Sequence, residues 1–142
     1  MSVDVETVAA VTDELVAAME RLLPQLSSSA APLDEDALGR LISWDGTTLL
    51  VARVEGVIVG TLTLVMFPIP TGMRAWIEDV VVDEGGRGRG VGAALTEAAV
   101  RLAKQRGARS IDLTSRPARA AANRLYERLG FRERDSKVYR LA

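Results

Sequence analysis

The sequence of 142 residues contains no cysteine and no histidine. Without cysteine, the chain has no disulfide, no thiolate nucleophile and no thiolate metal ligand. Without histidine, Ser–His and Cys–His catalytic pairs are excluded, and we expect no metal, because the usual zinc and iron sites depend on these ligands. Acid–base chemistry would therefore fall to Asp, Glu, Tyr, Lys or backbone groups.

Aromatic residues and long apolar runs are also scarce. Aromatics make up 4% of the chain, and no apolar stretch approaches the roughly 20 residues that cross a bilayer. The acidic N-terminal segment lacks the pattern of a signal or transit peptide, so we expect a cytoplasmic protein with no membrane partner. Apolar residues still account for 48% of the sequence, enough for a folded core. This length predicts one domain over residues 1–142.

Charge is divided unevenly along the chain. Residues 1–86 hold four Lys or Arg against fourteen Asp or Glu, a net −10, whereas residues 87–142 hold fourteen against five, a net +9. The asymmetry favours an anionic ligand for the C-terminal part and a cationic one for the N-terminal part, although solvated helix faces would give the same pattern. The basic part has few aromatics and no recognised nucleic-acid module, so we expect no nucleic acid as a partner.

The hydrophobic periodicity predicts helices and strands in a mixed order. We expect a helix from Thr12 that ends early at Pro24, and a loop at residues 68–72 that ends a strand. Further helices are expected at 34–43, from 91 to a stop at Gly107, and at 118–129; strands are expected at 3–11, 48–54, 57–67, 73–82, 110–114 and 131–141. This order favours a three-layer α/β or α+β domain in which strands 73–82 and 110–114 are parallel.

Strand 73–82 leads into the most distinctive stretch of the chain. Regular alternation would place Trp76, Glu78, Val80 and Val82 on one face of the strand, and Ile77, Asp79 and Val81 on the other. Five glycines and two arginines follow within residues 85–92. Glycine allows close approach of a ligand to the backbone, and the N-terminus of the next helix offers free N–H groups that suit a phosphate. A flexible connector is the simpler alternative.

Three phosphate-binding patterns can be compared with this stretch. The Walker A pattern fails, because Val91 stands where Lys-Ser/Thr is required after the last glycine. The dinucleotide pattern G-x-G-x-x-G/A is met by Gly88, Gly90 and Ala93, with Asp112 as the later acidic residue, and would indicate a nicotinamide dinucleotide. A third pattern, R/Q-x-x-G-x-G/A, is met by Arg87, Gly90 and Gly92.

The third pattern is part of a wider resemblance. Residues 78–92 resemble the acetyl-CoA-binding motif of the GNAT superfamily of N-acetyltransferases, and residues 119–131, with Asn123, Tyr126 and a closing Gly130-Phe131, are similar to its second cofactor motif. The resemblance implies an α/β (α+β) fold with a mixed, mostly antiparallel sheet of six to seven strands and about four helices. It also implies transfer of an acetyl group from acetyl-CoA to a primary amine in a ternary complex, with no metal.

The same resemblance implies roles for individual residues. Glu78 would serve as the base that takes a proton from the amine, and Tyr126 as the acid that protonates the departing thiolate; a solvated Glu78 and a merely packed Tyr126 are the alternatives. Asn123 would contact the pantetheine arm of coenzyme A. The main chain at Val80, Val81 and Val82 would also bind this arm, and the backbone amides of Arg87, Gly88, Arg89, Gly90, Val91, Gly92 and Ala93 would hold the pyrophosphate.

The acceptor of the acetyl group is left open by the sequence, because the N-terminal part carries no motif. A small molecule or a peptide amine would serve, and a homodimer is compatible with the resemblance. A catalytically idle module that binds acyl-CoA is the alternative function.

Overall fold

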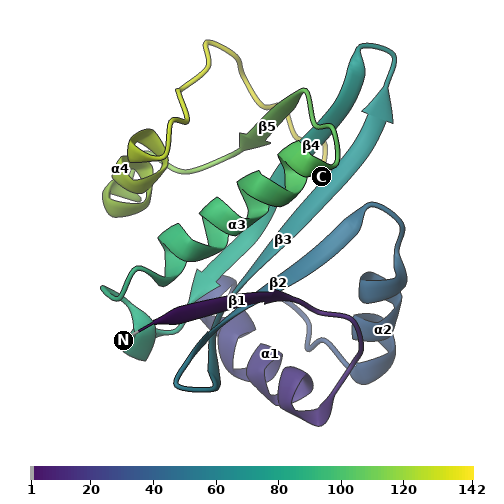
Figure 1. Cartoon of the computed structure of the whole chain (residues 1–142), viewed down its shortest axis with the longest axis vertical. Helices are drawn as coiled ribbons and strands as arrows, with labels where there is room; N and C mark the ends of the chain where they lie inside the picture. Colours follow the sequence, from purple (N-terminus) through teal and green to yellow (C-terminus); the bar gives the residue numbers. More distant parts are fainter. Residues whose placement is uncertain (1) are drawn as a thin grey trace.

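Five strands in the order β1-β2-β3-β4-β5 form one sheet, which four helices flank (Figure 1). The computed structural model of the chain describes residues 2–142. Neighbouring strands are antiparallel except β4 and β5, which are parallel. The elements are β1 (Val3–Thr7), α1 (Asp13–Leu26), α2 (Glu35–Ser43), β2 (Thr47–Val54), β3 (Val57–Ile69), β4 (Gly72–Val82), the 3₁₀ turn η1 (Glu84–Gly86), α3 (Val91–Gln105), β5 (Ser110–Leu113) and α4 (Ala120–Arg128).

This arrangement confirms the predicted mixed, mostly antiparallel sheet with helices on both faces. The described residues hold five strands, fewer than the six to seven expected. None of the helices in residues 2–142 has the length and apolar character needed to cross a membrane.

Two apolar cores lie on opposite faces of the sheet. Leu50 and Ala52 of β2 pack toward α3, whereas the intervening Leu49 and Val51 pack toward α1 and α2. Alternation along β2 therefore supplies both cores from one strand, because successive side chains point to opposite faces. The result is the three-layer arrangement that the order of elements predicted.

Helix α1 begins as predicted and ends later than predicted. Thr12 Oγ1 accepts a hydrogen bond from Leu15 N at 3.1 Å, which caps the helix. Pro24 does not end the helix, which continues to Leu26. Proline removes one main-chain donor, but Leu22 is fully buried against the sheet and Leu26 packs against the same core. Burial of this face outweighs the lost hydrogen bond.

The predicted loop at residues 68–72 was also wrong. Strand β3 continues through Pro68 to Ile69, and the turn to β4 is confined to two residues. The pairing of β2 with β3 ends at Thr47 and Val65, so β3 has β4 as its one neighbour at Pro68. A proline is tolerated there, because an unpaired strand edge needs no donor.

The C-terminal segment, residues 131–142, contains no strand, contrary to the prediction for 131–141. Its residues Val138, Tyr139 and Leu141 are exposed, at 73%, 86% and 102% of their full accessible surface. These residue types favour strands, but a strand also needs a hydrogen-bonded neighbour. The segment has none in the described chain.

A β-bulge interrupts β4 just before the glycine-rich stretch. Thr63 of β3 pairs with Glu78, and Thr61 pairs with Val81, so β4 uses one residue more than β3 over this interval. Asp79 has a φ of 48°, a left-handed conformation that is uncommon outside glycine. The extra residue bends β4 and shifts its side-chain alternation.

This shift overturns the predicted faces of β4. Regular alternation placed Glu78, Val80 and Val82 on one face, with Ile77 and Val81 on the other. In the structure, Val80 and Val82 pack against the α3 core together with Ile77, while Val81 is buried in the α1/α2 core. Glu78, which precedes the bulge, is exposed.

Candidate functional site

Strands β4 and β5 separate at their carboxyl ends. They pair from Arg74 and Ser110 to Ile77 and Leu113. Beyond Leu113 the chain turns toward α4, whereas β4 continues to Val82 (Figure 1). Residues 78–82 therefore have no ladder partner on the β5 side in the part of the chain that the structure describes. We refer to this opening as the fork; an extended ligand with amide groups can add to such a strand edge.

The glycine-rich stretch lies at the end of the fork and leads into α3. Gly88 and Gly90 have φ values of 79° and 78°, which glycine adopts without strain. A Cβ atom built at either position would meet nothing within 4 Å. Gly90 is the N-cap of α3, and neither a side-chain cap nor an acidic residue occupies the first turn. The N–H groups and the positive dipole end of α3 are therefore available to an anion.

Helix α4 lies across from this loop, and the two enclose a pocket of about 250 Å³. The α3 N-terminus and α4 approach closely, since a Cβ on Gly92 would lie 3.5 Å from Leu125 Cδ2. The pocket combines predicted loop residues with an unpredicted face of α4. Its walls are Val82, Gly86, Arg87, Gly88, Gly90, Val91, Gly92 and Ala93 on one side and Ala121, Ala122, Leu125 and Arg128 on the other.

The α4 residues of this pocket were missed, because Ala121, Ala122 and Leu125 carry no chemical signature and Arg128 is one of many arginines in the C-terminal part. Their spacing, with Ala121, Leu125 and Arg128 on one helical face, is the signal that could have found them. Of the predicted cofactor residues, Val80, Val81, Arg89, Asn123 and Tyr126 do not line the pocket.

Two arginines give the pocket a positive wall. Arg87 is exposed, and its Nε donates to the Val82 carbonyl at 3.3 Å, which holds the side chain beside the loop. Arg128 reaches the same pocket from the last turn of α4. Guanidinium groups form charge-assisted hydrogen bonds with phosphate oxygens. Together with the α3 N-terminus, they make this pocket suitable for a diphosphate.

Helix α1 braces the entrance to the loop through Asp83. Arg21 Nε donates to Asp83 Oδ2 at 3.0 Å, and Gln25 Nε2 donates to Asp83 Oδ1 at 3.2 Å. Gln25 Oε1 also accepts from Glu84 N at 3.1 Å. The hydrogen bond from Gln25, followed by that from Arg21, holds the pKa of Asp83 below its usual value. The sequence analysis did not anticipate this brace.

Tyr126 is buried on α4, with 9% of its surface exposed. The rings of Tyr126 and Phe131 pack edge to face, with their centroids 6.0 Å apart. Burial raises the pKa of Tyr126, and the nearby charge of Arg119 opposes this more weakly. The phenol therefore stays protonated at neutral pH. Its hydroxyl has no hydrogen-bond partner within residues 2–142, so it is free to donate to a ligand.

Asn123 and Glu78 both lie outside the pocket between the loop and α4. Asn123 Nδ2 donates to the Arg116 carbonyl at 3.0 Å and so braces the loop between β5 and α4. Glu78 lies at the mouth of the fork, on the sheet face opposite Val80. The structure does not place Glu78 in contact with Tyr126.

The sheet face that carries Glu78 holds a second carboxylate and an aromatic ring. Trp76 pairs with Asp112 of β5, and residues paired in adjacent strands share a face. Trp76 and Asp112 are both half-buried. This face therefore presents groups that can bind a cation, since carboxylates and indole rings both attract positive charge.

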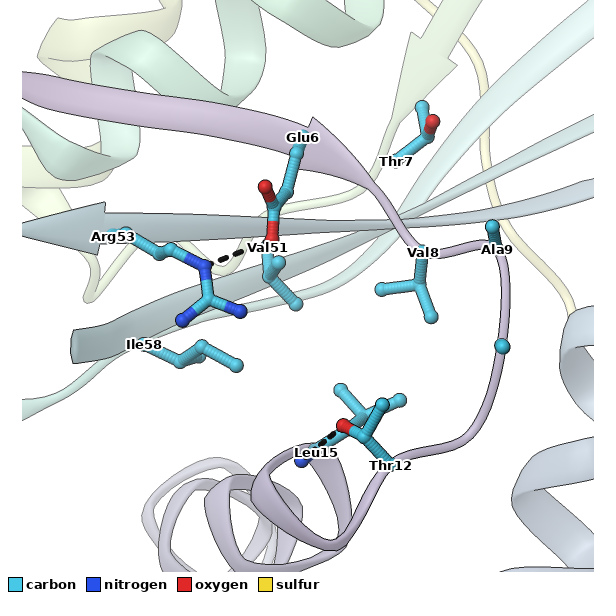
Figure 2. A pocket seen from close by; sticks show the side chains of 10 residues that line it. Glu6, Thr7, Val8, Ala9, Thr12, Leu15, Val51, Arg53 and Ile58 are labelled. Atoms are coloured by element: carbon cyan, nitrogen blue, oxygen red, sulfur yellow. Dashed lines mark hydrogen bonds and ion pairs between the residues drawn. The ribbon is translucent and has the colours of Figure 1, made fainter. Parts of the chain in front are cut away.

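A separate pocket of about 210 Å³ lies between β1 and α1 (Figure 2). Arg53 borders it and donates at 2.8 Å to Glu6 and to both carboxylate oxygens of Glu14. These ion pairs lower the pKa of Glu14 and raise that of Arg53. The charges at this rim satisfy one another, and β1 is the sheet edge farthest from the fork. We therefore place the candidate site at the fork and the glycine-rich loop.

Within residues 2–142, no group of acidic side chains is arranged to hold a metal ion.

The chain is similar in sequence to known acetyltransferases. The family model of the acetyltransferase (GNAT) family matches residues 12–131. An uncharacterized N-acetyltransferase from Methanocaldococcus jannaschii is 41% identical over 61 residues, a match that covers 43% of this chain and 27% of that protein. The chain thus spans about a quarter of the length of this curated relative.

Solved structures resemble the chain over its whole length. An aminoglycoside acetyltransferase from an uncultured soil metagenomic sample has a TM-score of 0.79 and 28% identity, covering 100% of this chain and 99% of that one. AAC(6')-Iy, in complex with the bisubstrate analogue CoA-S-monomethyl-acetylneamine, has a TM-score of 0.81 at 18% identity, with 100% and 99% covered, and so has the same fold.

Proposed function

The chain belongs to the acetyltransferase (GNAT) family, and on this premise we propose that it transfers an acetyl group from acetyl-CoA to a primary amine. One observation carries the proposal: the glycine-rich loop and α4 enclose a positively lined pocket directly beside the free edge of β4. A diphosphate and an amide-containing arm need these two features next to each other.

The residues at the pocket and the fork fit coenzyme A. The N–H groups from Arg87 to Ala93 would hold the diphosphate, with Arg87 and Arg128 neutralising its charge. The main chain of residues 80–82 would pair with the arm in the fork, as an added strand does. Asn123 would act indirectly, by holding the β5–α4 loop in place through the Arg116 carbonyl.

The reaction requires removal of a proton from the amine and delivery of a proton to the thiolate. Bound acetyl-CoA supplies the activated acetyl thioester. An alkylammonium titrates near pH 10, so we assign Glu78 to accept its proton, directly or through water. We assign Tyr126 to donate a hydrogen bond and then a proton to the sulfur. Its raised pKa keeps this proton in place until the sulfur becomes negative.

We further propose that the acceptor is a small cationic amine. Trp76, Glu78 and Asp112 share one sheet face, and the N-terminal part of the chain that covers this face carries most of the acidic residues. The aminoglycoside acetyltransferase to which the chain is 28% identical acts on a cationic small molecule by its name. Carboxylates at the fork would concentrate such a substrate beside the thioester.

The test is release of free thiol from acetyl-CoA in the presence of a panel of amines. The panel would contain aminoglycosides, polyamines, free amino acids and a peptide with a free N-terminus. We expect turnover with at least one cationic amine, with mass spectrometry showing one added acetyl group on the product. Binding of acetyl-CoA without turnover of any amine would instead support the idle acyl-CoA-binding module.

A further inference from the structure

One buried side-chain oxygen in the described chain has no hydrogen-bond partner: Ser115 Oγ. Burying a hydroxyl without a partner costs free energy, because the group loses its bonds to water and gains none. Such atoms are uncommon in folded proteins, and each one calls for an explanation, such as a partner that the chain itself does not supply. Ser115 has no role in the mechanism above.

Ser115 is located at the apex of the fork. It lies two residues beyond Leu113, the last residue of β5 that pairs with β4. If the register of Ile77 with Leu113 continued, Ser115 would lie opposite Asp79, the left-handed residue at which β4 bends. Ile111 and Leu113 both pack against the α3 core, and Ser115 is the next residue in this alternating series.

The main chain of the same loop is braced at the next residue, Arg116. The Arg116 carbonyl accepts from Arg119 N at 3.0 Å and from Asn123 Nδ2 at 3.0 Å. These bonds hold the β5–α4 loop against the first turn of α4. The hydroxyl of Ser115 is therefore held in a braced loop without taking part in the bracing. Its one missing interaction is a hydrogen bond to Ser115 Oγ, which a ligand that enters between β4 and β5 could supply.

We propose that Ser115 Oγ donates a hydrogen bond to an amide carbonyl of the pantetheine arm of coenzyme A and so positions the arm in the fork. The inference rests on the proposed function, since it requires the arm to enter between β4 and β5. It assigns Ser115 as a positioning residue of the cosubstrate. It also explains why the free chain buries an unpaired hydroxyl at this position.

The test compares two ligands by isothermal titration calorimetry. Coenzyme A contains the arm, whereas adenosine 3′,5′-bisphosphate contains only the nucleotide end. We expect Ser115→Ala to weaken coenzyme A binding about tenfold, which corresponds to about 1.4 kcal/mol, and to leave binding of the bisphosphate unchanged. Thr114→Ala is the matched control, since it removes an exposed neighbouring hydroxyl; it should change neither affinity.

Thermal unfolding of the free protein provides the second measurement. Because the hydroxyl has no partner in the free chain, Ser115→Ala should keep or raise the unfolding midpoint. A lowered midpoint, or equal weakening of both ligands, would show a structural role and overturn the inference. Unchanged coenzyme A affinity in Ser115→Ala would overturn it while leaving the proposed function intact. If the wild-type protein binds neither ligand, the proposed function fails as well.

Discussion

Tyr126 is the residue on which the proposed chemistry depends most. It is buried, its ring packs edge to face with Phe131, and its hydroxyl has no partner within residues 2–142. A phenol packed in this way has a fixed direction and a free proton. These are the properties that a proton donor to the thiolate needs. The sequence could indicate Tyr126 only through its place in the second motif, because burial and a free hydroxyl depend on how α4 packs.

We predict that Tyr126→Phe lowers kcat about tenfold or more while changing the dissociation constant of coenzyme A little. The substitution keeps the ring packed on Phe131 and removes only the donor. Steady-state kinetics and calorimetry measure the two quantities. Tyr139→Phe, at an 86% exposed tyrosine, is the control and should leave kcat unchanged. An unaltered kcat in Tyr126→Phe would remove this residue from the mechanism.

The raised pKa of Tyr126 also leads to a prediction about stability at alkaline pH. Burial raises its pKa in the folded state above the value near 10 of the unfolded chain. The folded state therefore binds the Tyr126 proton more tightly than the unfolded chain does. The protonated phenol makes its full contribution to the free energy of unfolding below about pH 10, and this contribution is lost as the pH rises through the pKa of the folded state. Unfolding midpoints between about pH 8 and pH 11 should fall more steeply for the wild type than for Tyr126→Phe. Parallel curves for the two proteins would contradict this account.

At the scale of elements, the glycine-rich loop is defined by backbone conformation more than by side chains. Gly90 and Gly107 flank α3, have φ values of 78° and 85°, and have open space where a Cβ would stand. They therefore form a matched pair that differs in position alone. Gly90 borders the pocket, whereas Gly107 lies at the other end of the helix.

We predict that Gly90→Ala and Gly107→Ala lower stability by similar amounts, about 1 to 2 kcal/mol, because each forces alanine into the left-handed region. Only Gly90→Ala should weaken coenzyme A binding, since it displaces the first N–H groups of α3 from the ligand. Denaturant unfolding and calorimetry separate the two effects. Equal affinities in the two variants would argue against an anion at the α3 N-terminus.

Elements specified by neighbouring residues were predictable from the sequence. Helix α1 begins at Thr12 as expected, because the Thr12 side chain caps it. The strands expected at 48–54 and 57–67 also occur, and the two residues between them, Glu55 and Gly56, form a tight turn with positive φ. The bulge at Asp79 was not predictable in the same way, because it depends on how β3 and β4 align across the sheet. Nor was the extension of α1 past Pro24, which depends on burial of Leu22 against the sheet.

At the scale of the molecule, the site is assembled from segments that are distant in sequence. The two motifs predicted that the glycine-rich loop and α4 cooperate, and the pocket brings them together. They did not predict which face of α4 lines it, because Asn123 and Tyr126 stand out chemically and Ala121 does not. Nor could they predict that the chain after α4 lacks a strand partner.

This C-terminal segment gives a prediction of its own. Residues 132–142 are exposed and have no hydrogen bond that ties them to the rest of the described chain. Ending the chain after residue 132 should therefore change the unfolding midpoint by no more than about 2 °C. Phe131→Ala, which removes the ring packed on Tyr126, should lower the midpoint by more. A larger loss on truncation than on Phe131→Ala would show that the segment contributes to the folded state.

The most direct test of the whole account is thermal unfolding with acetyl-CoA, coenzyme A or NADH present. A ligand at about 100 times its dissociation constant stabilises the folded state by about 2.7 kcal/mol, which raises the midpoint by several degrees. We predict this rise with acetyl-CoA and coenzyme A and no change with NADH. A rise with NADH alone would support the dinucleotide pattern of Gly88, Gly90 and Ala93. A rise with NADH alone, or with none of the three, would contradict the proposal that this pocket binds coenzyme A.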